Sequence, residues 1–397
     1  MFSYSLLSTH KKFVELRQSR KLVLFGAGRV AQKEINECFR WDDVVFVWDN
    51  DVKLHGKRIC DFIVSPPPCE AAECINFDDE YIVVVLIHYD DKITKIDITA
   101  QLQSLGINNI FYYDSLSLNK NMRFDFDTSK MFHECNTYRQ IEANKDKIAF
   151  VRSILSDEKS VSVYDAIIDK VKYNVSYYTE ISDDAFNPYF DQDFFTFSDR
   201  ETFVDGGAHY GESTIQFAQS IEMEKLVHSI AFEPDAQNFA KCAANFAKYL
   251  GEPENANHEN GSLYCDKYTL FKLGLWNENT ILRYARIGQN GEGTRFVNDN
   301  VQLGYDMVAS NKLDNIIDTS IKVTYIKLDV EGAEYQALSG AKQVILRNKP
   351  KLAVCGYHRV EDVWSLPLLI HSILPEYKIY IRQHSRAANE RIFYACV

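Results

Sequence analysis

Acidic residues follow several apolar segments in the second half of the chain, and they have the chemistry of a ligand site. Asp205 follows TFV, Glu233 follows SIAF, and Asp329 follows YIKL, with Glu331 two residues later. His358 ends the apolar segment KLAVCGYH. Carboxylates are costly at the end of a buried strand unless they meet a ligand or a partner. Four polar strand ends that converge on one crevice therefore predict a binding or catalytic site.

The loop that follows the first of these segments reads DGGAHYGES, and its glycines allow the backbone to turn sharply and approach a ligand closely. Its spacing, D-x-G-x-x-x-G, differs from the G-x-G-x-x-G of dinucleotide sites. An acid at the start suits a ligand with an ammonium group, such as S-adenosylmethionine (SAM), better than a pyrophosphate. An ordinary βα turn remains the alternative. The predicted cofactor contacts in this loop are Asp205, Gly206, Gly207, Ala208, Tyr210, Gly211, Glu212 and Ser213.

Glu233 ends the second apolar segment and is followed by Pro234 and Asp235. A carboxylate at the end of this strand can accept hydrogen bonds from both hydroxyls of a ribose. We therefore predict that Glu233 and Pro234 contact the cofactor. The alternative is that Glu233 caps the helix that begins near Asp235, although Asp235 can fill that role itself.

The stretch IKLDVEGAEYQALSGA, which starts at residue 326, holds three acids within six residues. Asp329 comes directly after the strand and is predicted to bind the cofactor or to act in catalysis. Glu331 and Glu334 lie at the start of a predicted helix, where a negative charge suits the helix dipole. We expect Lys327, within the strand, to face the opposite side.

The elements that position these residues alternate between strands and helices along most of the chain. In the first part, KLVLF, VVFVWDN, YIVVVLIH and NIFYYDS read as buried strands, and helical patterns cover residues 30–39 and 91–105. This alternation predicts parallel βαβ units in a Rossmann-like, doubly wound domain over residues 1–119. Residues 120–200 are predicted to form a helical connector that packs against the next domain.

In the region 201–397 the alternation returns. Five strand candidates are TFVDGG, HSIAFEP, YTLFKLGLW, VTYIKLDV and KLAVCGYH, and ILRYARIG is an extra strand after the third. The segments YKIYIRQH and RIFYACV are joined by the short polar loop SRAANE, which indicates an antiparallel hairpin. We therefore predict a second α/β domain with a mostly parallel sheet.

The first domain has a glycine loop of its own, KLVLFGAGRVA, which fits G-x-G-x-x-A after a strand. Gly26, Ala27, Gly28 and, about 20 residues later, Asp49 are the nucleotide-binding candidates. The region also resembles the N-terminal nucleotide-sugar domain of bacterial sugar acyltransferases. Three interpretations remain open: a nucleotide or nucleotide-sugar module, a structural domain, and an NAD site. Within residues 1–119 there is no Tyr-x-x-x-Lys pair, which weakens the dehydrogenase interpretation.

The motifs FVDGGAHYGE, AFEPD, IKLDVEGAEYQALSGA and CGYHRVEDVWSLP resemble those of the FkbM family of SAM-dependent methyltransferases, from about residue 202 onward. The resemblance implies a class I methyltransferase fold, with a mostly parallel seven-stranded sheet and an antiparallel C-terminal hairpin. It implies SAM as the donor and O-methylation, often of sugars or polyketide-like compounds. It puts Asp205, Gly207 and Gly211 in the SAM loop, Glu233 on the ribose and Asp329 near the sulfonium.

Methyl transfer to a sugar hydroxyl benefits from a positioned base because the hydroxyl is a weak nucleophile. His358 is predicted as the base or an anchor for the acceptor, with Asp329 as the alternative and a purely structural role for His358 still open. Trp276 is expected to line the adenine pocket or to lie in the core. The sulfonium is already reactive, so no metal is expected. His209 departs from the family, in which many members have Asn.

Bulk composition narrows the partners. The 397 residues carry a net charge of −12, which argues against binding to duplex nucleic acid. The longest apolar run is too short to span a bilayer, and the first 20 residues lack the apolar core of a signal peptide. Nine cysteines without CxxC spacing suggest free thiols and a cytoplasmic protein. We expect a small-molecule or glycan acceptor; the alternatives are an NAD-dependent sugar-modifying enzyme and a non-catalytic nucleotide-sugar-binding protein.

Overall fold

The computed structural model describes two compact units. It covers residues 11–28, 44–59, 62–70, 76–86, 92–112, 135–173, 178, 180–183, 188–190, 194–252, 255–257, 261–285, 295–296, 306–386 and 389–397. The first unit comprises Met1–Ala143 with Val171–Val175, and the second comprises Asn144–Lys170 with Ser176–Val397. The helices expected to form a separate connector are thus divided between the units.

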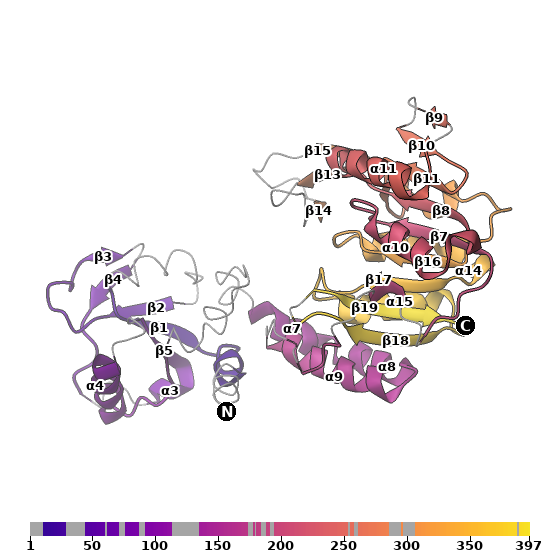
Figure 1. Cartoon of the computed structure of the whole chain (residues 1–397). Coiled ribbons are helices and arrows are strands. Elements are labelled where there is room, and N and C mark those ends of the chain that lie inside the picture. Colours follow the sequence, from indigo (N-terminus) through magenta and orange to yellow (C-terminus); the bar gives the residue numbers. More distant parts are fainter. Residues whose placement is uncertain are drawn as a thin grey trace. The chain divides into compact units, whose positions relative to one another are not determined.

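The first unit is built on a six-stranded sheet of order β3-β4-β2-β1-β5-β6 (Figure 1). Its strands are β1 (Lys21–Phe25), β2 (Val44–Trp48), β3 (Arg58–Ile59), β4 (Phe62–Ser65), β5 (Tyr81–Val85) and β6 (Ile110–Tyr112). All neighbours are parallel except β3 and β4. Successive residues of β1 enter different cores, with Leu22 and Leu24 in one and Val23 and Phe25 in the other. A strand buried on both faces explains the continuous apolar run in its sequence.

Two helices of this unit are α3 (Phe77–Glu80) and α4 (Lys92–Ser104). Ile98 and Leu102 of α4 belong to the core that contains Val23 and Phe25. The structure therefore confirms the parallel α/β sheet predicted here. The helix predicted for residues 30–39 lies outside the described residues.

The second unit contains a nine-stranded sheet of order β18-β19-β17-β16-β7-β8-β11-β10-β9. Its strands are β7 (Glu201–Gly206), β8 (Leu226–Phe232), β9 (Asn255–Asn257), β10 (Ser262–Tyr264), β11 (Tyr268–Phe271), β16 (Tyr325–Leu328), β17 (Lys351–Cys355), β18 (Lys378–Gln383) and β19 (Arg391–Cys396). The five neighbouring strands β17, β16, β7, β8 and β11 are parallel, and β19 is antiparallel to both β17 and β18. These strands confirm the expected sheet and hairpin, and β9 and β10 extend its edge.

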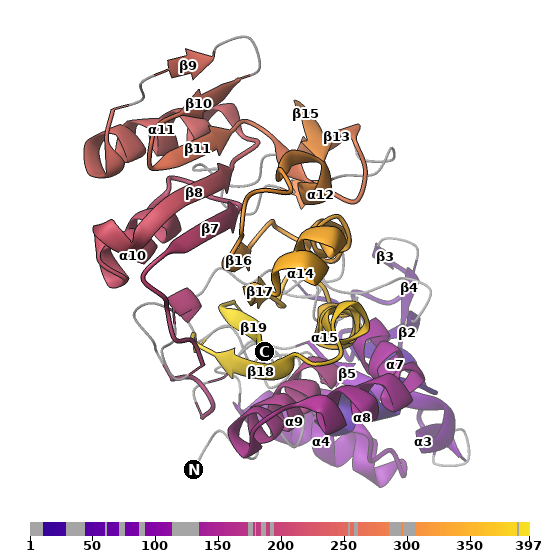
Figure 2. The ribbon, with the colours of Figure 1, turned by 90° about the vertical axis from the view of Figure 1, so that its right-hand side faces the viewer.

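Helices cover both faces of this sheet (Figure 2). One face carries α10 (Glu212–Ser220) and α11 (Ala236–Leu250), and the other carries α13 (Glu334–Ser339), α14 (Lys342–Asn348) and α15 (Asp362–Ile373). Asp235 caps α11, since its side chain accepts hydrogen bonds from the backbone N–H groups of Gln237 and Asn238. The capping alternative for Glu233 is therefore not needed.

The segment YTLFKLGLW was predicted as one strand, and this prediction is wrong. After β11 the chain bends and enters a separate four-stranded sheet of order β12-β15-β13-β14. Its strands are β12 (Gly274–Leu275), β13 (Thr280–Ala285), β14 (Arg295–Phe296) and β15 (Asp306–Asn311), followed by α12 (Leu313–Ile316). An unbroken apolar pattern does not reveal where a strand changes partners.

Three helices come from the region expected as a connector: α7 (Cys135–Ala143), α8 (Lys145–Ile154) and α9 (Glu158–Lys172). The start of α9 is bound to the edge strand β18, where Ser160 Oγ accepts from Ile381 N at 3.0 Å. Nearby, Asp157 Oδ2 lies 2.7 Å from Arg382 Nη2. These contacts explain why α8 and most of α9 belong to the second unit. Among the helices in the described parts of the chain, none combines the length and apolarity needed to cross a membrane.

Candidate functional site

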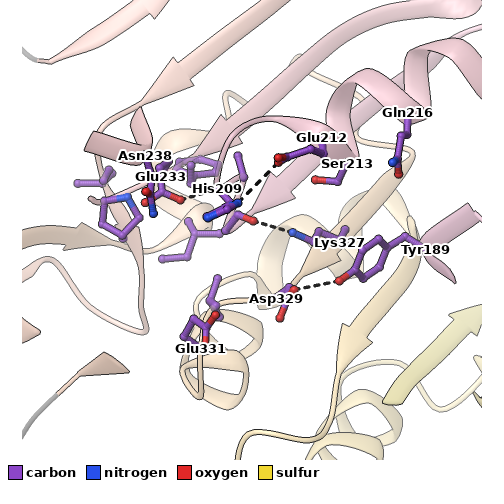
Figure 3. Close-up of a pocket in the computed structure, with 18 of the residues that line it drawn as sticks. Tyr189, His209, Glu212, Ser213, Gln216, Glu233, Asn238, Lys327, Asp329 and Glu331 are labelled. Carbon is purple, nitrogen blue, oxygen red and sulfur yellow. Dashed lines mark hydrogen bonds and ion pairs between the residues drawn. The ribbon is translucent and has the colours of Figure 1, made fainter. Parts of the chain in front are cut away.

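A cavity of about 390 Å³ lies at the carboxyl ends of β7, β8 and β16. Open parallel sheets bind their ligands at this end. We call it the central cavity, and Figure 3 shows its polar side chains converging from several elements. It is lined by Tyr189, Gly207, Ala208, His209, Glu212, Ser213, Gln216, Phe232, Glu233, Pro234, Asn238, Leu273, Gly274, Leu275, Lys327, Asp329, Val330, Glu331 and Glu390.

The loop between β7 and α10 needs glycine at two positions. Gly207 has a φ of +78°, and a Cβ atom there would lie 1.9 Å from the backbone oxygen of Asp329. Gly211 has a φ of +89°, and its Cβ atom would lie 2.5 Å from the ring of Phe246. These glycines let the loop lie against the end of β16 and let α10 pack on α11. Gly207 lines the central cavity, whereas Gly211 serves the packing behind it.

Asp205 supports this loop from within the protein and does not line the central cavity. Its side chain is fully buried, and Oδ2 accepts hydrogen bonds from Ser213 Oγ at 2.5 Å and Thr214 Oγ1 at 2.8 Å. Oδ1 lies 3.1 Å from Nζ of Lys327. The contacts indicate that Asp205 holds α10 and β16 in register with β7.

Lys327 was expected to face away from the site, and this expectation is wrong. It is the direct neighbour of Asp205 across parallel strands, so both side chains lie on the same face of the sheet. Nζ also donates to the backbone oxygen of Gly207 at 2.7 Å. Although burial lowers the pKa of Lys327, the negative charges of Asp205 and Asp329 raise it above its ordinary value. The ammonium group therefore ties the glycine loop to β16.

Glu233 lies at the end of β8 and is only 5% exposed. Oε2 accepts from His209 N and Oε1 accepts from Asp235 N, each at 2.8 Å. Burial raises the pKa of Glu233 to about 7 in spite of these hydrogen bonds. Asn238 lines the same cavity and is buried, and its Oδ1 has no hydrogen-bond partner among the described residues. Two acceptor groups are thus available to a ligand with hydroxyl or amino donors.

Asp329 follows β16 and is held by two tyrosines. Tyr189 OH donates to Oδ2 at 2.9 Å, and Tyr357 OH donates to Oδ1 at 3.2 Å. Burial raises the pKa of Asp329, but the charges of Lys327 and His358 and the Tyr189 hydrogen bond bring it below its ordinary value. The carboxylate is therefore ionised and fixed in orientation at the cavity wall.

His358 is enclosed by three carboxylates. Nδ1 lies 3.0 Å from Glu334 Oε1, and Nε2 lies 3.3 Å from Glu331 Oε2 and 3.8 Å from Asp329 Oδ1. Burial lowers the pKa of this imidazole, but the neighbouring carboxylates, Glu334 first, raise it to about 11. His358 does not line the central cavity. Both facts favour a structural role, the alternative left open for it, over that of the base.

Other predicted contacts lie behind the cavity wall. Gly206, Tyr210 and Trp276 do not line the central cavity. The Tyr210 ring stacks on the His209 ring, with centroids 3.7 Å apart. The backbone N–H of Trp276 donates to Asn311 O at 3.0 Å. The predicted residues that do line the cavity are Gly207, Ala208, Glu212, Ser213, Glu233, Pro234 and Asp329.

Several polar lining residues were not predicted, namely Tyr189, Gln216, Asn238 and Glu390. Tyr189 belongs to the 3₁₀ turn η3 (Pro188–Phe190), and Glu390 precedes β19, so both come from outside the glycine-loop and strand-end motifs. Gln216 and Asn238 lie one turn inside α10 and α11, where the helix period places them on the same side as the helix starts. This period is the signal that could have identified these two.

In the first unit, Asp49 lies at the corresponding position after β2. Its Oδ2 accepts from Ala27 N at 2.6 Å, and its Oδ1 accepts from Asp51 N at 2.7 Å. The carboxylate thus closes its own turn. Nucleotide binding at Gly26, Ala27, Gly28 and Asp49 stays a prediction, and residues 29–43, which follow the loop, lie outside the described part of the chain.

Known proteins resemble this chain in sequence and in fold. Residues 205–382 match the family model of the methyltransferase FkbM domain. A crystal structure of methyltransferase FkbM from Methylobacillus flagellatus KT superposes on 98% of this chain and 98% of its own, with 20% identity and a TM-score of 0.54. An rRNA methylase from Streptococcus thermophilus aligns over 50% of this chain and 86% of its own, with 13% identity and a TM-score of 0.29, which is too low to support an argument. No curated protein matches the chain in sequence. The match to the family model identifies residues 205–382 as a methyltransferase FkbM domain. The superposition shows that the chain shares the fold of the Methylobacillus flagellatus protein.

Proposed function

We propose that the second unit transfers the methyl group of SAM to a hydroxyl of a sugar, in a glycan or a nucleotide-linked sugar. One observation carries the proposal. Glu233 follows β8 and Asp329 follows β16, the strands on either side of β7, and both residues line the central cavity. The loop of Gly207, which follows β7, lies between them. Glu233 can accept hydrogen bonds from the ribose hydroxyls of SAM. Asp329 can place a negative charge near the sulfonium.

The chemistry of the cavity wall suggests an orientation for SAM. Glu233 and the Oδ1 atom of Asn238, which accepts no hydrogen bond from any described residue, suit the ribose because both are buried acceptors. The apolar stretch of Phe232, Pro234 and Leu273–Leu275 suits the adenine ring. The charged methionine end then lies by the glycine loop, near Glu212 and Ser213.

Asp329 is the residue we assign to the reacting centre. When bound, SAM supplies an electrophilic methyl group, and the protein must align an acceptor oxygen with it and exclude water. Tyr189 and Tyr357 fix the orientation of the Asp329 carboxylate, which can accept the hydrogen bond of an acceptor hydroxyl. We assign the acceptor to the part of the central cavity around Asp329, whose polar lining also includes Tyr189 and Glu331.

Calorimetric titration of the full chain with SAM and, separately, with NAD tests the donor. We expect SAM to bind at one site per chain and NAD not to bind in the second unit. Tight NAD binding without SAM binding would overturn the proposal in favour of a nicotinamide-dependent enzyme.

The acceptor requires a screen. Sugar nucleotides and glycans incubated with the protein and methyl-labelled SAM should show a mass gain of one methyl group on a sugar hydroxyl. If the labelled methyl group is found on an amine or a nucleic-acid base and on no sugar, a sugar hydroxyl is excluded as the acceptor. SAM would still be the donor. A nucleotide-sugar site in the first unit remains part of this proposal, and Asp49→Ala should then weaken binding of the acceptor without changing that of SAM.

A further inference from the structure

A compact group of metal-ligating side chains lies where β16 and β17 end. Asp329, Glu334 and His358 each offer one ligand atom, and these atoms all lie within 4.8 Å of one another. Glu331 is adjacent, with Oε2 at 3.3 Å from His358 Nε2. Glu334 is fully buried, and the side chain of His358 is 12% exposed. The group is therefore largely withdrawn from water.

The group lacks positive charge. Asp329, Glu331 and Glu334 surround a single imidazole, so three carboxylates share one basic side chain. Asp362 is another buried acid nearby, and the negative charge of Glu334 contributes to raising its pKa. Lys327 acts on Asp329, but its ammonium group is paired with Asp205. Buried carboxylates are costly without a compensating cation.

Two buried atoms at this place are also unsatisfied. Glu334 Oε1 accepts from Val330 N at 2.8 Å and Gly332 N at 3.3 Å, but within the described parts of the chain Oε2 has no hydrogen-bond partner. Nδ1 of His358 lies 3.0 Å from Glu334 Oε1, yet it has no well-aligned hydrogen bond to any described residue. Neighbouring ligands of one metal ion, each about 2.1 Å from it, lie about 3 Å apart and do not point at each other. The separation of these two atoms is therefore one that two ligands of the same ion can have.

We propose that Asp329, Glu334 and His358 bind a divalent metal ion. An imidazole combined with two carboxylates suits Mn²⁺ or Zn²⁺ better than Mg²⁺ or Ca²⁺, which prefer oxygen ligands alone. The proposal departs from the sequence-based expectation that the protein needs no metal. The binding site itself depends neither on SAM nor on methyl transfer.

A consequence for the reaction rests on the proposed function. Asp329 also lines the central cavity, so a metal ion bound to it lies beside the acceptor. A bound cation would lower the pKa of a coordinated acceptor hydroxyl and so make it a better nucleophile. Metal binding can be measured without SAM or an acceptor, so failure of the metal site and failure of methyl transfer are distinguishable.

The test uses the metal-depleted full chain, titrated by calorimetry with MnCl₂, ZnCl₂ and MgCl₂ in the absence of SAM. We expect one Mn²⁺ or Zn²⁺ per chain and at least about tenfold weaker binding of Mg²⁺. The electron paramagnetic resonance signal of free Mn²⁺ should fall with the same stoichiometry. His358→Asn and Glu334→Gln should each weaken Mn²⁺ binding by about 100-fold, because each removes a ligand.

Glu361→Gln is the matched control. Glu361 lies three residues from His358 with its side chain 48% exposed, and it pairs with Arg359. Its replacement should leave Mn²⁺ binding unchanged. The circular dichroism spectrum and thermal unfolding of each metal-free variant show whether the fold is intact, and Asp329→Asn replaces any variant that does not fold. No saturable Mn²⁺ or Zn²⁺ binding up to about 1 mM, or binding that persists in both His358→Asn and Glu334→Gln, would overturn the proposal.

Discussion

The two glycine loops of this protein share a hydrogen-bond pattern but differ in what surrounds it. In the first unit Asp49, after β2, accepts from Ala27 N in the loop and from Asp51 N. In the second unit Glu233, after β8, accepts from His209 N in the loop and from Asp235 N. An acid at the end of the second strand thus closes the βα turn of the first strand in both units. This pattern alone does not identify a ligand site.

The strand on the other side of each loop makes the difference. In the first unit β5 lies beside β1, reads YIVVV and is apolar throughout. In the second unit β16 lies beside β7, carries Lys327, and is followed by Asp329. We infer that β16 makes the difference between the two sheets. It brings charged side chains to the glycine loop of the second unit and lines the central cavity, whereas β5 does neither in the first unit.

Removal of the lysine from β16 should have the largest effect. Lys327→Met leaves Asp205 buried without its partner, and breaking such a pair costs about 3–5 kcal/mol of unfolding free energy. Urea denaturation followed by hydrogen exchange in β7 measures this loss in the second unit alone. The double variant Lys327→Met/Asp205→Asn should regain part of it. A loss below about 1 kcal/mol would mean that the pair behaves as a solvent-exposed one.

The next largest effect is expected from alanine substitutions at two loop glycines, one in each unit. Gly207→Ala brings a Cβ atom to 1.9 Å from Asp329 O at a φ of +78°, so we expect a loss of about 3 kcal/mol and no SAM binding. Gly28→Ala, whose Cβ atom would meet nothing within 4 Å, should change stability by about 0.5 kcal/mol or less. The same denaturation experiment compares both. In the first loop Gly26 makes the matching approach, since its Cβ atom would lie 2.8 Å from Leu86 O at a φ of +111°, so Gly26→Ala should also be costly. Equal losses in Gly28→Ala and Gly207→Ala would contradict the claim that the close approach of the backbone sets the cost.

Substitutions of Glu233 and Asp49, the acids that follow β8 and β2, should distinguish SAM binding from closure of the turn. Glu233→Ala removes an acceptor for two ribose hydroxyls, and we expect about 100-fold weaker SAM binding by calorimetry. Asp49→Ala is the matched control and should leave the SAM affinity unchanged. If Glu233→Ala binds SAM with unchanged affinity, Glu233 does not bind the ribose.

The smallest expected effect is a pH dependence of SAM binding. Burial raises the pKa of Glu233 to about 7, so the carboxyl is protonated at lower pH and accepts hydrogen bonds poorly. Affinity should therefore rise with pH, by up to about tenfold per unit between about pH 5 and 7, and level off above. Glu233→Gln should bind more weakly with a flat profile in this range. A wild-type profile that is flat as well would show that Glu233 does not control binding by its charge.

Much of the fold was predictable because apolar runs identify buried strands wherever they occur. Strands β1, β2, β5 and β6 and the C-terminal hairpin of β18 and β19 were predicted on that basis, whereas the short strands β3 and β4 were not. The small sheet that begins with β12 was not, because pairing with β15, about 30 residues later, leaves no local pattern. Tyr189 and Glu390 escaped prediction for the same reason, since they reach the central cavity from elements distant in sequence.

The sequence by itself determined which residue types follow each strand, and with them the general location of the site. Parallel strands bring their carboxyl ends together, so Glu233 and Asp329 had to meet near the same loop. Only the tertiary structure decided their roles. Burial and neighbouring charges place Asp205 in support of the loop, turn Lys327 toward it, and surround His358 with carboxylates. Such effects depend on distances between residues far apart in the chain, which sequence spacing does not contain.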